Sequence, residues 1–200
     1  PSLSLVTLSG PAGTGKTLMA CLAGIRTIMN ESSSCKQLLV LRPIEEVGKE
    51  LGFLPGTIEE KFDPWVAPIH ACVDLIVGGT KESANGGGGV NTRAKKLRES
   101  ISVKPVNYIR GVTISNTFVI IDEAQNLTPH ALKTAVTRIG EGSRLVITGD
   151  SSQIDNKYLD AWNNGLVHVV SRFAGQEVSA HLRLTQSERS LLAELGAKLL

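Results

Sequence analysis

The chain has 200 residues, of which 42% are hydrophobic and 20% are charged, and its formal net charge at pH 7 is +2. This length and composition indicate a soluble globular protein with one sizeable core. With no run of 18 apolar residues and no signal-peptide pattern, the sequence predicts no membrane span, and the small charge does not by itself indicate nucleic-acid binding.

Apolar runs and helical patterns alternate along the chain. Such alternation predicts βαβ units and an α/β fold with a mostly parallel sheet and helices on both faces. In chain order, we expect a strand at Leu3–Leu8, a helix at Lys16–Asn30, a strand at Leu38–Leu41, a helix at Asp63–Val77, a strand at Phe118–Ile121, a helix that begins at Thr128 and Pro129 and closes at Gly140, a strand at Leu145–Thr148, a helix near Asp160–Ser171, a strand near Val178–Leu182, and a helix from Ser187 to the end.

One segment departs from this alternation. Residues Gly78–Arg93 contain two glycine runs among Ser, Asn and Thr and almost no apolar side chain, so they predict a flexible surface loop. We interpret this loop as an insertion into a single domain that spans residues 1–200, because helical stretches flank it. The chain starts at Pro1, almost directly before a strand, and we expect it to be a fragment of a longer protein.

A glycine-rich turn lies between the first expected strand and the first expected helix. It matches the pattern Gly-x-x-x-x-Gly-Lys-Thr, for which a chance match in a chain of this length has odds of roughly one per cent. Glycines let the backbone wrap around a phosphate, and the following helix adds the positive end of its dipole. We expect the Lys16 ammonium to contact the β- and γ-phosphates of ATP and the Thr17 hydroxyl to bind Mg²⁺. The residues of this predicted phosphate loop are Gly10, Pro11, Ala12, Gly13, Thr14, Gly15, Lys16 and Thr17.

Two adjacent carboxylates follow the strand Phe118–Ile121. In a parallel sheet, the end of this strand and the end of the first strand lie at the same edge, where ligands bind. Asp122 is therefore expected to hold Mg²⁺ through water, and Glu123 to orient and polarise the water that attacks the γ-phosphate. The alternative is an ordinary strand that ends in a solvated acidic turn, which the nearby phosphate loop disfavours.

A third strand end carries the motif Gly-Asp-x-x-Gln at residues 149–153. Its similarity to motif III of helicases favours a sensing role, in which Gln153 contacts the γ-phosphate and Asp150 braces it. The alternative is a tight turn built from good turn residues. Phosphoryl transfer also creates negative charge that an arginine often neutralises, and Arg138 and Arg189 are the candidates, within the chain or across an interface. For each arginine the alternative is a surface salt bridge.

The cysteines and histidines are scattered along the chain. The three cysteines form no Cys-x-x-Cys pair, which argues against a disulfide framework and a zinc site and favours a reducing cytoplasm. Each histidine is expected on the surface or in the core rather than as a metal ligand. These residues are Cys21, Cys35, Cys72, His70, His130, His168 and His181.

Taken together, the motifs resemble the PhoH family, especially the ATPase half of the PIN–PhoH fusion proteins. The similarity spans nearly the whole chain outside Gly78–Arg93, and its most specific blocks are Leu51–Gly56 and Asp122–Pro129. The further matching stretches are Gly10–Thr17, Leu41–Ile44, Glu59–Lys61, Pro64–Ile69, Tyr108–Gly111, Asn126–His130, Thr137–Gly142, Thr148–Gln153 and Glu188–Ser190.

The resemblance implies a P-loop NTPase with a RecA-like, superfamily 1 helicase-like core that uses ATP and Mg²⁺. It also implies RNA unwinding coupled to an attached PIN ribonuclease, often in a hexameric ring of identical subunits. The chain contains no PIN domain, so we expect no nuclease activity from it. The upstream segment that usually helps to hold the adenine is also missing, which leaves the base preference open.

Several side chains are candidates for contact with single-stranded nucleic acid, and RNA as the partner follows from the resemblance alone. Arg42 and Arg110 flank expected strand ends and are expected to contact a phosphate backbone. Trp65 or Phe53 could stack on a base, with core packing as the alternative. A cluster of basic side chains could make a salt-dependent contact with a phosphate backbone. The alternative interpretation of this cluster is a solvated helix face. Its members are Arg93, Lys95, Lys96, Arg98 and Lys104.

Three functions are compatible with these motifs. The first is an ATP-driven motor that acts on RNA, and the second is a nucleotide-gated switch that acts on a protein partner. The third, a small-molecule kinase, is the weakest, because the chain has Gly-Asp-x-x-Gln and no evident acceptor pocket. Stimulation of hydrolysis by single-stranded RNA would separate the first two functions.

Overall fold

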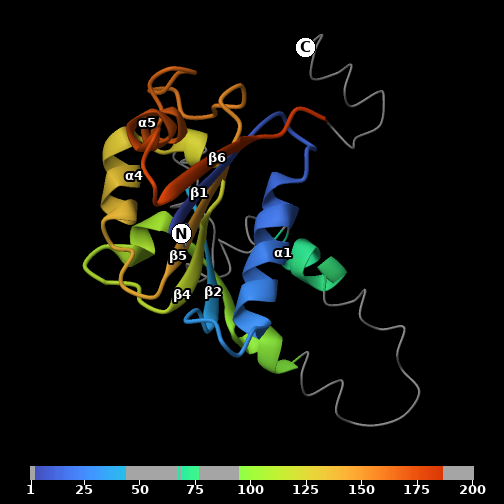
Figure 1. Ribbon diagram of the computed structural model, residues 1–200. Coiled ribbons are helices and arrows are strands. Elements are labelled where there is room, and N and C mark those ends of the chain that lie inside the picture. The colour runs from blue at the N-terminus through green and yellow to red at the C-terminus, as the bar shows by residue number, and fades with distance from the viewer. Residues whose placement is uncertain (1–2, 44–66, 68, 77–94, 187–200) are drawn as a thin grey trace, which may run out of the picture.

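A six-stranded parallel sheet is the centre of the computed structural model (Figure 1), which describes residues 3–43, 67, 69–76 and 95–186. The strands are β1 (Leu5–Ser9), β2 (Gln37–Arg42), β3 (Ile101–Pro105), β4 (Thr117–Ile121), β5 (Arg144–Gly149) and β6 (Ser179–Arg183). The helices are α1 (Lys16–Met29), α4 (Pro129–Val136) and α5 (Gly165–Phe173), with the 3-10 turns η3 (Val106–Ile109) and η4 (Ala124–Asn126) and helical backbone at residues 67, 69–76 and 95–99.

The strand order in the sheet is β3-β2-β4-β5-β1-β6, and every neighbouring pair is parallel. β5 therefore lies between β1, which leads into the glycine-rich turn, and β4, which leads into the two carboxylates. The register pairs Ser9 with Gly149 and Leu41 with Ile121, so these neighbouring strands end nearly level. Their carboxyl ends consequently form one edge, where ligands of α/β sheets bind. This arrangement confirms the predicted parallel α/β fold and agrees with a P-loop NTPase.

Helices cover both faces of the sheet, as predicted. In Figure 1, α4 and α5 lie on one face, and α1 lies on the other face beside residues 69–76. Alternate residues of β4 point to opposite faces, so Val119 and Ile121 pack with α4 and α5, whereas Phe118 and Ile120 pack with α1. Because both sets are buried, β4 is an unbroken apolar run in the sequence.

Helix α1 approaches the sheet closely because a glycine faces it. A Cβ on Gly24 would lie 2.8 Å from Leu38 Cδ1 and 3.0 Å from Phe118 Cδ1, which is closer than side chains tolerate. The helix therefore rests on the central strands with no side chain between, and this contact sets where its first turn lies relative to the carboxyl edge of the sheet.

Strand β3 is absent from the sequence prediction. It lies at an edge of the sheet, where only one neighbour is needed, and none of its five residues is fully buried. Ser102 and Lys104 interrupt its apolar residues, so the segment lacks the continuous apolar run by which the central strands are identified. The expected strands are all present, with bounds shifted by one or two residues.

Helix α4 begins as predicted but ends early. The Thr128 hydroxyl accepts from the Ala131 amide at 3.1 Å as the N-cap, and Pro129 is the first helical residue. The helix stops at Val136 rather than near Gly140, because the chain from residue 138 pairs with Ile114. The Ile114 amide donates to the Arg138 carbonyl at 2.8 Å, and the Gly140 amide donates to the Ile114 carbonyl at 2.6 Å.

Helix α5 begins later than predicted. The Asn164 side chain accepts from the Val167 amide at 3.0 Å, so the N-cap is Asn164 and the helix starts at Gly165 instead of near Asp160. Of the helix expected at Asp63–Val77, residues 67 and 69–76 are described and are helical. The loop Gly78–Arg93 and the helix from Ser187 to the end lie outside the described residues. Within the described ranges, no helix is both long and apolar enough to cross a membrane.

Candidate functional site

The glycine-rich turn joins β1 to α1 at the carboxyl edge of the sheet. Gly15 adopts a left-handed conformation with φ 78° at the N-cap of α1, and no side chain caps the helix there. The amides of the first helical turn therefore point toward an outside acceptor, which suits a phosphate group. Gly10 lies against Leu184, whose carbonyl oxygen would collide with any Cβ at position 10. The geometry thus requires glycine at both positions.

The ammonium group of Lys16 lies beside this turn. Its Nζ donates to the carbonyl oxygens of Gly10 at 2.7 Å and Pro11 at 2.8 Å, and the residue is buried. Thr14 tightens the same turn by donating its hydroxyl to the Pro11 oxygen at 2.9 Å. A bound phosphate would offer the ammonium a charged acceptor in place of two neutral ones, and charge-assisted hydrogen bonds are the stronger kind.

Asp122 connects the start of α1 to the end of β4. Its Oδ1 accepts from the Thr17 hydroxyl at 2.8 Å and from the Thr148 hydroxyl, and its Oδ2 lies 3.3 Å from Arg42 Nε. The residue is only 2% exposed, and these contacts compensate its buried charge. The structure thus brings together Thr17 and Asp122, the two residues that the sequence predicts as Mg²⁺ ligands.

These two oxygen donors fit a magnesium ion that arrives with a nucleotide. Mg²⁺ prefers oxygen ligands and is usually bound by one or two protein carboxylates, with water and substrate phosphates completing its shell. The hydroxyl of Thr17 and the carboxylate of Asp122 are such a pair. In the part of the chain that the structure describes, no group of three or more His, Cys, Asp or Glu side chains could hold a metal ion. Thr17 and Asp122 therefore fit a magnesium site in which the phosphates of a bound nucleotide supply the remaining ligands, rather than a site built from protein ligands alone.

Glu123 follows in a left-handed conformation, with φ 55° and ψ 40°. Such a conformation costs a residue other than glycine about 1–3 kcal/mol, and this strain is concentrated at functional sites. The Glu123 Oε2 accepts from Gln125 Nε2 at 2.6 Å, and Oε1 lies 3.7 Å from Arg42 Nη2. The side chain is 34% exposed, so water reaches it, as the predicted role requires.

Gln125 links the acidic pair to the Gly-Asp-x-x-Gln turn. Its Nε2 also donates to the Gln153 carbonyl at 2.9 Å, and its Oε1 accepts from the Asp150 amide at 3.0 Å. The residue is only 1% exposed. A Cβ on Gly149 would lie 2.5 Å from Gln125 Oε1, so the turn needs glycine to admit this side chain. The motifs in the sequence predict no role for Gln125, whose only local signal is an amide two residues after the acidic pair.

Asp150 holds the third motif in its turn. Its Oδ1 accepts from the Ser152 amide at 3.0 Å and from the Ser152 hydroxyl at 2.6 Å. Gln153 is exposed at the carboxyl edge, and its amide donates to the Asp150 carbonyl at 3.0 Å. The tight-turn interpretation and the sensing interpretation are therefore compatible, because the turn itself attaches Gln153 to Glu123 through Gln125.

Arg42 lies beside the acidic pair at the end of β4. Its side chain is 13% exposed and lies against Asp122 and Glu123, because β2 and β4 are neighbours and end at the same edge. The structure thus places the Arg42 guanidinium against the two carboxylates, and its contact with a nucleic-acid backbone stays a prediction. Arg110, in contrast, is exposed beyond the end of β3, as a backbone contact requires.

Arg138 lies at the amino edge of the sheet. It follows α4 and pairs with Ile114, which precedes β4, whereas the phosphate loop is at the carboxyl edge. Strands of this length separate the two edges by roughly 15–20 Å, so Arg138 does not reach the phosphate site of its own chain. The structure therefore places Arg138 away from the phosphate loop of its own chain, its role at a phosphate stays a prediction, and the described residues form no salt bridge with it. Arg189, Trp65 and Phe53 lie outside the described residues.

The predicted basic group does not form one surface. Lys95, Lys96 and Arg98 are exposed on the helical residues 95–99, which precede the amino end of β3, and Arg98 pairs with Asp74 at 2.7 Å. Lys104 lies at the other end of β3, near the carboxyl edge. Three members of the group therefore match the solvated helix face, and Arg93 lies outside the described residues.

Cys21 is buried in α1, one turn after Thr17, and the three cysteines are free thiols as predicted. Burial, with smaller contributions from Cys72 and Asp122, raises the pKa of the Cys21 thiol from 9.0 to about 12. The unfolded chain releases this proton near pH 9, whereas the folded chain keeps it until about pH 12. The stability that this thiol contributes is therefore complete below pH 9 and is lost as the pH rises toward 12.

We expect the free energy of unfolding to fall more steeply above pH 9 in the wild-type chain than in Cys21→Ala. One proton released on unfolding corresponds to a slope of up to about 1.4 kcal/mol per pH unit. Urea unfolding of both proteins, followed by circular dichroism across this pH range, measures the two slopes. The slopes should coincide between about pH 6 and 8, where the thiol is protonated in both states. If the free energy of unfolding had the same pH dependence in both proteins above pH 9, the raised pKa of Cys21 would be contradicted.

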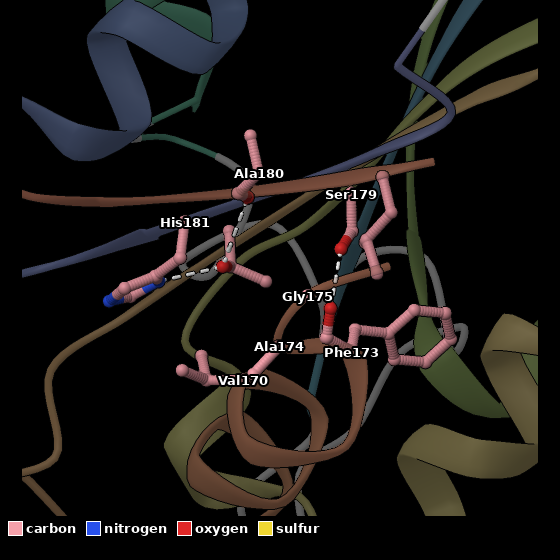
Figure 2. Close-up of a pocket in the computed structure, with 9 residues that line it drawn as sticks. Val170, Phe173, Ala174, Gly175, Ser179, Ala180 and His181 are labelled. Atoms are coloured by element: carbon pink, nitrogen blue, oxygen red, sulfur yellow. Dashed lines mark hydrogen bonds between the residues drawn. The ribbon is translucent and has the colours of Figure 1, made fainter. Parts of the chain in front are cut away.

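A separate cavity of about 210 Å³ lies between α5 and the strands β1 and β6 (Figure 2). Val170, Phe173 and Ala174 supply much of its apolar lining. Its polar corner is a hydrogen bond of 2.7 Å between the Thr7 hydroxyl and His181 Nδ1. None of its lining residues belongs to the phosphate loop, so the cavity is distinct from the predicted nucleotide site.

Comparisons with known proteins give a consistent family. A model of the PhoH-like protein family matches residues 2–194. Protein PhoH2 of Bacillus subtilis is 48% identical over 198 residues, which are 99% of this chain and 43% of that protein. Protein PhoH2 of Thermobispora bispora is 35% identical over 206 residues, which are 100% of this chain and 43% of that protein. A PhoH-like protein of Synechocystis sp. is 40% identical over 146 residues, 73% of this chain and 41% of its own length. The chain thus spans less than half the length of these relatives.

Proposed function

The chain belongs to the PhoH family. From this premise we propose that residues 1–200 form one P-loop ATPase domain that hydrolyses Mg²⁺-ATP. We further propose that hydrolysis is coupled to the binding and unwinding of RNA, which the domain contacts as a single strand. The observation that carries the proposal is the hydrogen bond of 2.8 Å between Thr17 and Asp122. It joins the phosphate loop to the acidic strand end, so one nucleotide could contact the lysine, the hydroxyl and both carboxylates.

In this proposal each residue of the site has a separate role in binding or hydrolysing the nucleotide. Lys16 and the amides of the loop bind the β- and γ-phosphates, and Thr17 with Asp122 would hold the magnesium ion, which supplies charge neutralisation on the phosphates. Glu123 orients the attacking water and polarises it by accepting a hydrogen bond from it. Gln125 holds the Glu123 carboxylate in place. Gln153 contacts the γ-phosphate and reports its loss to the surface loops.

The proposal extends to the assembly. Arg138 at the amino edge would serve the phosphate site of a neighbouring copy, in a homo-oligomer of six subunits, as would Arg189. In a longer chain, a PIN ribonuclease domain would precede the ATPase domain and would receive RNA from it. Native mass spectrometry of the chain with ATP and Mg²⁺ tests the ring, and a purely monomeric species would contradict it.

Single-stranded RNA should raise the rate of ATP hydrolysis by roughly tenfold or more, a coupling free energy of about 1.4 kcal/mol. The rate of phosphate release at low salt, with and without an oligouridylate or the matching oligodeoxythymidylate, measures this effect. A rise with RNA supports the motor. Hydrolysis that no nucleic acid changes would contradict the motor and favour a nucleotide-gated switch that acts on a protein partner. The absence of any hydrolysis would contradict both.

A further inference from the structure

We propose that Lys104, Tyr108 and Arg110 form a binding platform for single-stranded polynucleotide, with one base stacked on the Tyr108 ring. The proposal rests on the proposed function and gives it a specific contact surface. It assigns the base-stacking role to a residue other than the two aromatic residues that the sequence singled out. The platform is defined by these three residues and lies just beyond the end of β3.

The backbone of the platform is anchored while its side chains face solvent. Val106 and Ile109 of η3 are buried, with exposures of 7% and 2%, so the turn is fixed to the core. Tyr108, between them, is 55% exposed, and Arg110 is exposed at the end of the turn. An exposed tyrosine gains little from core packing, and its ring is accessible to a ligand from solvent. A stacking site needs an aromatic ring that faces solvent on a backbone that is already ordered. Binding then costs little conformational entropy, because the backbone is not ordered anew.

The chemistry of the platform matches a polynucleotide strand. The Lys104 Nζ lies 3.6 Å from the centroid of the Tyr108 ring, a cation–π contact that orients the ring. A base could stack on the remaining surface of the ring, while Lys104 and Arg110 contact the flanking phosphates. Residues 101–113 contain these two cations and no acidic residue, so nothing in this segment repels a phosphate backbone.

The platform also lies close to the catalytic edge. The register of the sheet pairs Pro105, the last residue of β3, with Arg42 of β2. Arg42 in turn contacts Asp122 and Glu123. A strand bound on Tyr108 would therefore lie three residues beyond the β3 position that pairs with Arg42. This placement gives polynucleotide binding a short physical route to the rate of hydrolysis.

A second pair of exposed aromatic residues is a weaker candidate. Tyr158 and Trp162 are 89% and 86% exposed on the loop that follows β5. That loop contains one cation, Lys157, against the three carboxylates Asp150, Asp155 and Asp160, so its local charge disfavours phosphate. Charge complementarity therefore assigns the polynucleotide to Tyr108, and Tyr158 provides a matched control.

Binding of a fluorescein-labelled oligouridylate, measured by fluorescence anisotropy, tests the platform. We expect Tyr108→Ala to weaken binding by roughly 5- to 150-fold, the range for loss of one stacked base, and Tyr108→Phe to retain most of the affinity. Lys104→Gln and Arg110→Gln should each lower the slope of log affinity against log salt by about 0.7. Tyr158→Ala should bind as the wild type does, and hydrolysis without RNA should be unchanged in all the variants.

The outcomes separate this inference from the proposed function. If the wild type binds RNA and Tyr108→Ala binds equally well, the platform is wrong and the motor stands. If Tyr158→Ala is the variant that loses affinity, the stacking site belongs to the loop after β5 and the platform is again wrong. If the wild type binds no polynucleotide at low salt, both the RNA part of the proposed function and the platform fail. Circular dichroism melting of each variant checks that it is folded, and Lys104→Gln gives a second reading if Tyr108→Ala is not.

Discussion

Replacing Glu123 by glutamine should lower the turnover number for ATP by about 10²- to 10⁴-fold, the contribution typical of a positioned general base. Glutamine keeps the shape of the side chain and can still accept from Gln125, which now donates to Glu123 Oε2 at 2.6 Å. It cannot draw a proton from water, however. ATP affinity should change by no more than about threefold, because Lys16, Thr17 and Asp122 are unchanged and the loss falls on the transition state.

Single-turnover hydrolysis and an equilibrium titration with a fluorescent ATP analogue measure these two quantities separately. Glu141→Gln is the matched control, because Glu141 is exposed and its carbonyl bonds to Asn116 at the amino edge of the sheet. The control should hydrolyse ATP at the wild-type rate. Wild-type turnover in Glu123→Gln would remove Glu123 from the proposed role, whereas a parallel loss of affinity would indicate that it holds the nucleotide instead.

Replacing Lys16 by alanine should weaken ATP binding by roughly 10- to 150-fold. This range corresponds to about 1.5–3 kcal/mol, the value of a hydrogen bond to a charged group. The free chain shows why the loss falls on binding: Lys16 already lies in the loop, where it donates to the Gly10 and Pro11 carbonyls. The wild-type ammonium therefore needs no large movement to meet a phosphate, and the variant has no other cation on the loop.

Isothermal titration calorimetry with ATP and with ADP measures the affinities of this variant. ATP should lose more affinity than ADP, because the lysine is expected to contact the γ-phosphate as well as the β-phosphate. Lys36→Ala is the control, since Lys36 is exposed and its Nζ donates to the Glu31 carbonyl at 3.0 Å, away from the site. Unchanged ATP affinity in Lys16→Ala would refute the phosphate site.

The two variants examine different halves of one constellation. Lys16 belongs to the loop after β1, and Glu123 belongs to the end of β4, with β5 between them. The Thr17–Asp122 contact and the Gln125 contacts with Glu123 and Gln153 connect all three strand ends. Loss of binding in one variant and loss of turnover in the other would be the signature of a shared nucleotide.

The parts of the site that sequence reasoning identified are those with a local signature. The phosphate loop needs glycines at defined positions beside a lysine, and the acidic pair follows an unbroken apolar strand. Such signals depend only on residues close together in the chain. The edge strand β3 and the start of α5 were missed or misplaced because their local patterns are weak: β3 is half polar, and Asn164 resembles any loop asparagine until it caps a helix.

By itself, the sequence determined the alternation of strands and helices, the two-sided burial of the central strands, and the three motifs that end β1, β4 and β5. Only the tertiary structure decided which strands are neighbours and therefore which side chains meet. Thr17 and Asp122 are 105 residues apart in the chain, and their contact exists because β5 alone separates β1 from β4. The same packing places Arg42 beside the two carboxylates and Arg138 at the opposite, amino edge of the sheet. Long-range pairing of this kind is set by burial and register over the whole sheet, so no local pattern contains it.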